Sequence, residues 1–199
     1  CPVLVKPAAS TPLSCYTFIE ILREAGLPGG WAQMVLPEKT ELATEMVSDP
    51  RVSFFSFIGS SRVGWMLKSK LAPGTRCALE HGGVAPVIVS ADADLDDVVE
   101  RVAKGGFYHA GQVCVSVQRI FCDKQIVDVF SQKLAEAAGK LKVGDPTKPD
   151  TDVGPLISEK ECQRVADWVQ EAIDGGASLH AGGKKISGTC YEPTVLVGA

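Results

Sequence analysis

Short apolar runs alternate with helix-like segments through the first part of this chain, and this rhythm restricts the possible folds most. Strands are predicted at 2–5, 31–36, 52–57 and 76–79, and apolar residues at helical spacing predict helices over 14–24, 38–47 and 59–70. Glycine and proline residues separate the segments, as in Gly26-Leu27-Pro28-Gly29-Gly30. Strands joined by helices indicate β-α-β units, so the sequence predicts an α/β fold with a parallel sheet and helices on both faces.

The rest of the chain continues this pattern after the glycine pair Gly82-Gly83. Strands are predicted at 85–89 and 117–122, a capped helix after Asp92-Ala93-Asp94, and amphipathic helices at 124–141 and 158–173. A short helix and loop lead to Cys114, and a strand-loop-strand section comes last. We therefore predict two domains, 1–80 and 81–199.

Composition excludes several classes of protein. The chain has 199 residues, 45% of them hydrophobic and 22% charged, and a net charge of −4. The mild acidity and the lack of a basic run argue against nucleic-acid or anionic-membrane partners. The apolar runs are too short for a membrane span. The chain begins and ends in strand-like runs, which we interpret as a piece of a longer protein.

The cysteines indicate a reducing compartment. Their number is odd, and no two have the spacing of a zinc or thioredoxin-type motif; they are Cys1, Cys15, Cys77, Cys114, Cys122, Cys162 and Cys190. Free thiols fit a cytoplasmic protein. Most of them are expected to be buried apolar filler.

One cysteine has a context that suggests chemistry. Cys114 follows Gly111-Gln112, and Glu80 precedes the glycine pair. A thiolate with a nearby carboxylate can carry out covalent carbonyl chemistry, with the thiol as nucleophile and the acid as proton acceptor for water. The pair alone is a weak signal.

A second candidate site is the turn after the third predicted strand, Gly59-Ser60-Ser61-Arg62-Val63-Gly64. Because it opens a helix, its backbone amides could hold a phosphate. The spacing differs from the G-x-G-x-x-G fingerprint, and a tight turn that binds nothing remains an equal alternative.

Other site classes fail on spacing. A serine-hydrolase elbow requires glycine where Val63 stands. A Walker phosphate-binding loop requires Ser or Thr after Gly-Lys, but Gly183-Lys184 is followed by Lys185. The three histidines are far apart in sequence, so no metal site is predicted; they are His81, His109 and His180.

The order and intervals of the remaining motifs resemble those of the NAD(P)-dependent aldehyde dehydrogenase superfamily from end to end. The motifs are Val5-Lys6-Pro7-Ala8, Thr11-Pro12-Leu13, Glu24-Ala25-Gly26-Leu27-Pro28, Phe57-Ile58-Gly59-Ser60-Ser61-Arg62-Val63-Gly64, Leu79-Glu80-His81-Gly82-Gly83, Ala91-Asp92-Ala93-Asp94-Leu95-Asp96, Gly111-Gln112-Val113-Cys114, Val153-Gly154-Pro155-Leu156-Ile157 and Glu192-Pro193-Thr194-Val195-Leu196.

This resemblance implies a Rossmann-like cofactor domain, a catalytic domain, and oxidation of an aldehyde to a carboxylic acid with NAD or NADP. Cys114 would be the nucleophile that passes through a thiohemiacetal and a thioester, and its backbone amide would form half of the oxyanion site. Glu80 would activate the hydrolytic water. The expected cofactor contacts are Lys6, Ala9, Gly59, Ser60, Val63 and His81.

Two residues depart from the family pattern. Ala9 stands where the family often has a glutamate that binds the ribose hydroxyls, so we expect NADP to be tolerated or preferred. His81 replaces the usual leucine where the backbone approaches the cofactor. It could perturb Glu80 or point away from it.

The resemblance also implies that the piece is incomplete. The oxyanion asparagine would precede Cys1, and the glutamate of the nicotinamide ribose would follow Ala199. The full protein would be a homo-oligomer, a dimer or tetramer, and this piece alone would lack groups needed for turnover. Two alternatives remain: a non-catalytic module of the same fold, and an acylating dehydrogenase that uses coenzyme A. The intact Glu80 and Cys114 argue against both.

Overall fold

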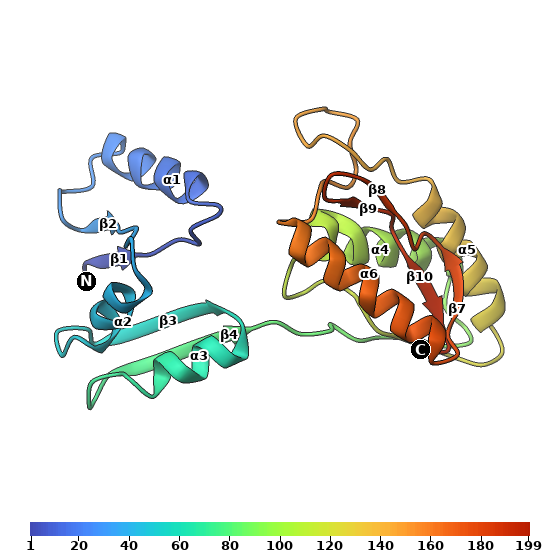
Figure 1. Ribbon diagram of the computed structural model, residues 1–199, viewed down its shortest axis with the longest axis horizontal. Coiled ribbons are helices and arrows are strands. Elements are labelled where there is room, and N and C mark those ends of the chain that lie inside the picture. Colours follow the sequence, from blue (N-terminus) through green and yellow to red (C-terminus); the bar gives the residue numbers. More distant parts are fainter. The chain divides into compact units, whose positions relative to one another are not determined.

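Strands and helices alternate through the first of the two units into which the chain divides, Cys1–His81 and Gly82–Ala199. The computed structural model describes residues 1–199. The element order of the first unit is β1 (Val3–Val5), α1 (Leu13–Glu24), β2 (Ala32–Met34), α2 (Thr40–Ser48), β3 (Phe54–Gly59), α3 (Ser61–Lys68) and β4 (Arg76–His81) (Figure 1). The predicted alternation is confirmed, and only the ends of the elements differ.

Both strand pairs of the first unit are parallel. Strand β1 pairs with β2, with Val5 beside Met34. Strand β3 pairs with β4 along its whole length, and its last residue, Gly59, lies beside His81. Helix α1 connects the first pair and α3 connects the second, because parallel neighbours need a crossover connection.

The sheet differs from the prediction in its extent. The pairs β1–β2 and β3–β4 are separate two-stranded sheets. Along β3 the burial alternates, and the residues that face away from α3 are open to solvent, with Ile58 78% and Phe54 53% exposed. Helix α3 covers one face of β3–β4. The predicted α/β pattern of parallel strands joined by helices is present in both strand pairs.

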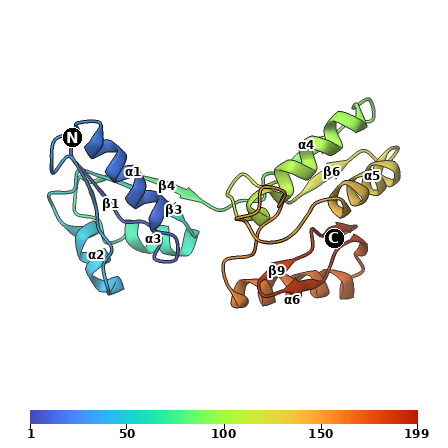
Figure 2. The same cartoon turned by 90° about the horizontal axis from the view of Figure 1, so that it is seen from above.

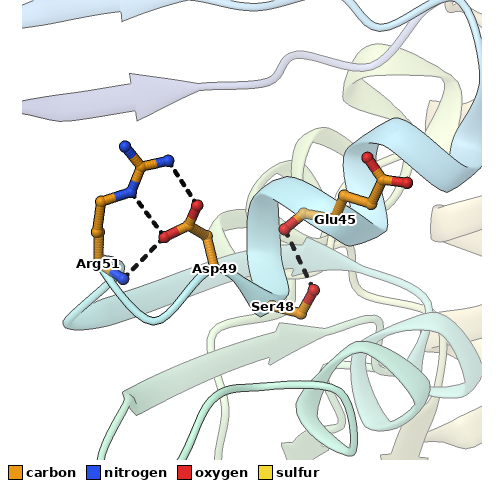
Figure 3. Close-up of polar contacts among 4 residues, drawn as sticks. All are labelled: Glu45, Ser48, Asp49 and Arg51. Atoms are coloured by element: carbon orange, nitrogen blue, oxygen red, sulfur yellow. Dashed lines mark hydrogen bonds and ion pairs between the residues drawn. The ribbon is translucent and has the colours of Figure 1, made fainter.

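Helix α2 ends in a turn closed by ion pairing. The Asp49 carboxylate accepts hydrogen bonds from the Arg51 backbone amide at 2.8 Å, from its Nε at 2.9 Å and from its Nη2 at 2.7 Å (Figure 3). The Ser48 hydroxyl donates to the carbonyl of Glu45 at 3.2 Å. Chiefly because of the side-chain bonds to Arg51, the pKa of Asp49 falls to about 2. Pro50 keeps Asp49 extended and so ends the helix.

The second unit begins with another parallel pair and then becomes antiparallel. Its elements are β5 (Val87–Val89), α4 (Leu95–Phe107), the 3₁₀ turn η1 (Tyr108–Gly111), β6 (Ile120–Cys122), α5 (Val127–Gly139), α6 (Glu159–Asp174), β7 (Ser178–Ala181), β8 (Lys185–Ser187), β9 (Cys190–Tyr191) and β10 (Val195–Val197). Strands β5 and β6 are parallel, whereas β7–β10 and β8–β9 are antiparallel. The predicted strand-loop-strand section is thus two antiparallel pairs.

The main core of this unit lies between α4 and α5, which pack against each other (Figure 2). Its buried residues come from β5, both helices and β10, and they are Val89, Val99, Val102, Ala103, Phe130, Leu134, Ala138 and Val195. The helix predicted after Asp92-Ala93-Asp94 is confirmed as α4, and Val99 and Val102 are buried on its apolar face. Asp94 caps this helix by accepting the amide of Asp96 at 3.1 Å.

A smaller core anchors α6. Its buried residues are Leu156, Cys162 and Tyr191, and the half-buried Ala110 packs against them. Burial raises the pKa of the Tyr191 phenol. Because Ala110 belongs to the segment before Cys114, this small core ties that segment to the end of the chain. No helix of the structure is both long and apolar enough to cross a membrane.

Candidate functional site

Gly59, Ser60 and Val63 come together where β3 runs into α3. The Ser60 side chain caps the helix by accepting the amide of Val63 at 3.4 Å. A Cβ on Gly59 would stand 2.6 Å from the Phe57 ring, so only glycine fits here. Helix geometry leaves the amides of Ser61 and Arg62 without an intrahelical acceptor.

These free amides can donate hydrogen bonds to a phosphate. They lie at the positive end of the helix dipole, and such ends bind anions. The glycine keeps the approach free of a side chain. The turn has the amides that a phosphate would need, and its role as a cofactor contact stays a prediction.

Glu80 and His81 end strand β4. Glu80 lies beside Ile58 in the parallel register, and its side chain is exposed. The His81 imidazole packs against α3, with its ring centroid 6.0 Å from that of Trp65. Successive strand residues point to opposite faces, so the two side chains diverge. Of the two interpretations of His81, the structure favours the one in which it points away from Glu80.

The His81 ring is also unusual in its polar contacts. Its Nε2 is buried and has no hydrogen-bond partner. With the side chain directed at the helix, a cofactor contact at this position would come from the backbone.

Lys6 and Ala9 follow β1 and are exposed. The Lys6 ammonium donates to the carbonyl of Pro7 at 2.8 Å. Ala9 lies in a turn closed by a hydrogen bond from Thr11 to Ala8 at 3.2 Å. The Lys6 ammonium is therefore open to solvent just before this turn, and the methyl group of Ala9 places no negative charge there.

Cys114 is exposed on a short turn between η1 and β6. The turn closes through a hydrogen bond from the amide of Ser116 to the carbonyl of Val113 at 3.0 Å. A thiol presented in this way can attack an electrophilic carbon when it ionises. Its own backbone amide is close at hand for the oxyanion that would form.

The segment after Cys114 is tied to the end of α4. Ser116 is fully buried, and its hydroxyl donates to the carbonyl of Gly106 at 3.0 Å. The amide of Val117 donates to Gly105 at 3.1 Å. A Cβ on Gly106 would come within 3.1 Å of the Val117 carbonyl, so the glycine allows this close approach.

The segment before Cys114 follows an unusual path. His109, Ala110 and Gly111 have φ angles of 50°, 54° and 72°, three consecutive residues in the left-handed region. Two of them are not glycine, which costs free energy and is typical of functional sites. Ala110 is held there by its packing on the small core.

Gln112 bridges this segment to a distant part of the chain. Its Nε2 donates to the carbonyls of His109 at 3.1 Å and Pro155 at 3.3 Å, and its Oε1 accepts the amide of Ile157 at 2.8 Å. Gln112, Ser116 and the glycines of α4 were not predicted from the sequence as site residues. Of these residues, only Gln112 belongs to a motif noted in the sequence, Gly111-Gln112-Val113-Cys114.

The structure contains no group of three or more His, Cys, Asp or Glu residues that could hold a metal ion. The polar groups that it does bring together suit a nucleophilic thiol in the second unit and an anion-binding turn in the first.

The amino-acid sequence is similar to those of known proteins over its full length. The chain matches the model of the aldehyde dehydrogenase family over residues 1–199. It is 41% identical over 194 residues to a 3-sulfolactaldehyde dehydrogenase of Priestia aryabhattai, covering 98% of this chain and 40% of that protein. It is 36% identical to the NADP⁺-dependent succinate-semialdehyde dehydrogenase of Escherichia coli, covering 99% and 42%.

A solved structure gives the same picture of the fold. Succinate-semialdehyde dehydrogenase from Burkholderia pseudomallei superposes with a TM-score of 0.94 at 41% identity, covering 100% of this chain and 42% of that one. The chain thus spans about 40% of the length of the relatives that it matches. The chain has the same α/β fold as the matching part of this solved structure. With its full length matched and this level of identity, the chain belongs to the aldehyde dehydrogenase family.

Proposed function

We propose that the full-length protein containing this chain oxidises an aldehyde to a carboxylic acid with NAD or NADP, through a covalent intermediate on Cys114. The observation that carries the proposal is the exposed thiol of Cys114 on a turn fixed from both sides. The family membership supports it.

Each residue has a separate task. The Cys114 thiolate attacks the aldehyde carbon, and its backbone amide donates to the oxyanion of the thiohemiacetal. A bound NAD or NADP would supply the hydride acceptor, and loss of hydride from the thiohemiacetal would leave a thioester on the Cys114 sulfur. Glu80 takes a proton from water, which attacks the thioester and frees both the acid and the thiol.

The cofactor would be held by the first unit. The amides at the start of α3, beside Gly59 and Ser60, would bind the pyrophosphate, with Val63 on the same turn. Lys6 would donate to the adenosine ribose, and the backbone at His81 would approach the nicotinamide end. Ala9 would leave room for a 2′-phosphate.

The substrate would be a short aldehyde with an anionic group. This follows from the names of the relatives, since 3-sulfolactaldehyde has a sulfonate and succinate semialdehyde a carboxylate. We also propose a homo-oligomer located in the cytoplasm. The free state of all seven cysteines is consistent with that compartment.

The experiment measures formation of reduced cofactor by the full-length protein with aliphatic, aromatic and semialdehyde substrates. Cys114→Ser should abolish turnover, whereas Cys1→Ser, the change at the other exposed cysteine, should leave it intact. Glu80→Gln should still give one rapid turnover and then stall, because the thioester is not hydrolysed.

Three outcomes would redirect the assignment. Turnover in Cys114→Ser would refute the covalent mechanism. Turnover that requires coenzyme A would indicate an acylating dehydrogenase. Cofactor binding without turnover of any aldehyde would indicate a non-catalytic module.

A further inference from the structure

Gln112 makes three hydrogen bonds around the Cys114 turn, which we define as residues 112–116, and no step of the proposed reaction uses it. Two of these bonds reach residues 43 and 45 positions further along the chain, Pro155 and Ile157. The side chain itself is solvent-exposed. Exposed side chains seldom form several bonds to distant backbone groups, so these contacts indicate a role for Gln112 in the local structure.

The Gln112 carboxamide binds the backbone around Leu156 as a neighbouring peptide group would. The carboxamide offers a donor and an acceptor, as a peptide group does, and pairs with the carbonyl of Pro155 and the amide of Ile157. These groups flank a single residue, Leu156. A neighbouring β-strand makes the same pair of bonds across one residue.

The segment on the other side of this contact is itself fixed. Leu156 is buried in the small core, and its amide donates to the carbonyl of Thr189 at 3.0 Å. Ala110, two residues before Gln112, packs on the same core. Gln112 therefore joins the Cys114 turn to a rigid support.

We propose that Gln112 is a positioning residue that holds the Cys114 turn against residues 155–157. It fixes the path of the backbone on the N-terminal side of the thiol, just as Ser116 fixes the C-terminal side through Gly106. The catalytic consequence rests on the proposed function, because a nucleophile displaced by about 1 Å can cost about 100-fold in rate.

The remaining contacts show what removal of Gln112 leaves intact. Ser116 keeps its bond to Gly106, and Ala110 keeps its apolar packing. The bonds lost are exposed ones, which contribute little to global stability. The fold should therefore persist in variants at this position, and the change should be local.

The test compares three variants of the full-length protein with wild type: Gln112→Ala, Gln112→Asn and Gln112→Glu. Gln163→Ala is the matched control, because Gln163 makes one exposed bond to Asp167 within α6. Amide hydrogen exchange is followed in peptides covering 108–118 and 155–158. In parallel, kcat and KM are measured with the best aldehyde substrate.

We expect faster exchange in both peptides for Gln112→Ala and Gln112→Asn, and exchange like that of wild type in Gln163→Ala. We expect kcat to fall about 10- to 100-fold, with KM changed less than about threefold. Asparagine should not rescue, because it is one methylene too short to reach both groups.

Gln112→Glu adds a pH signature. A protonated carboxyl can donate to Pro155 and accept from Ile157, whereas a carboxylate loses the donor and faces a carbonyl oxygen. The ratio of kcat in this variant to that of wild type should therefore rise as the pH is lowered from about 8 towards the usual carboxyl range near 4.3.

Unchanged exchange in Gln112→Ala would overturn the proposal, and so would faster exchange with unchanged kcat. Failure of the proposed function looks different. In that case wild type itself turns over no aldehyde, while hydrogen exchange still decides whether Gln112 holds the turn.

Discussion

Glycine at position 64 leaves the space that the imidazole of His81 occupies. A Cβ on Gly64 would stand 2.4 Å from His81 Nε2 and 3.0 Å from the ring of Phe57. The start of α3 therefore lies close to the end of β4, and the helix that carries the proposed phosphate turn is fitted directly to the strand that carries Glu80.

Gly64→Ala should destabilise the protein. The methyl group gains about 1 kcal/mol in helix propensity but forces an overlap that costs about 1–3 kcal/mol. In a His81→Ala background the same change should be neutral or stabilising, because most of the overlap is gone. Urea unfolding of the two single variants and the double variant gives the coupling, and additive effects would contradict this contact.

His81→Leu should stabilise the protein by about 1–3 kcal/mol, because it removes a buried nitrogen that has no hydrogen-bond partner. Leucine keeps an apolar side chain of similar reach against Trp65. The thermal midpoint should rise relative to wild type. His180→Leu, a change at an exposed histidine, is the control and should have little effect. A lower midpoint for His81→Leu would mean that the nitrogen has a partner in solution.

The Asp49 carboxyl should titrate with a pKa of about 2. Since folding lowers this pKa below the unfolded value of about 3.9, the stabilising contribution is fully present above pH 3.9 and is lost as the pH falls through about 2. Arg51→Ala should return the pKa towards its ordinary value. NMR titration of the side-chain carboxyl measures both, and an equal pKa in the two proteins would refute the ion pair of Figure 3.

Ala9→Glu should shift the cofactor preference of the full-length protein towards NAD. The new carboxylate would repel a 2′-phosphate and accept bonds from ribose hydroxyls, so the affinity ratio of NADP to NAD should fall by at least about tenfold, or ~1.4 kcal/mol. Equilibrium binding of both cofactors to wild type and variant measures the ratio. Wild type that already binds NAD about tenfold tighter than NADP would contradict the expected role of Ala9.

The sequence allowed prediction of the elements whose patterns are local. The capping sequence Asp92-Ala93-Asp94 predicted α4, and the short apolar runs predicted the strands. The prediction of helix 124–141 was too long, because Asp123 closes a turn with the amide of Gln125 at 2.8 Å and delays the start of α5 to Val127. The spacing of apolar residues does not predict where a side-chain hydrogen bond closes a turn before a helix.

Contacts between distant residues could not be predicted in this way. The direction of His81 depends on the register that places it beside Gly59, and two-residue alternation alone fits either face. The bonds of Gln112 to Pro155 and Ile157 join segments that no local pattern connects. Histidine adopts positive φ more often than most residues, but that preference is too weak to predict the φ angles of His109, and alanine has no such preference.

The positive φ angles of His109 and Ala110 restrict which residues a related chain can have at these two positions if its backbone follows the same path. Val, Ile and Thr branch at Cβ and are genuine outliers at positive φ, whereas Gly, Asn, Asp and His adopt it more readily. A chain with a β-branched residue at the position of His109 or Ala110 should follow another route from α4 to its cysteine. The residues at these two positions should therefore distinguish chains that can adopt this backbone path before the cysteine from chains that share only the fold.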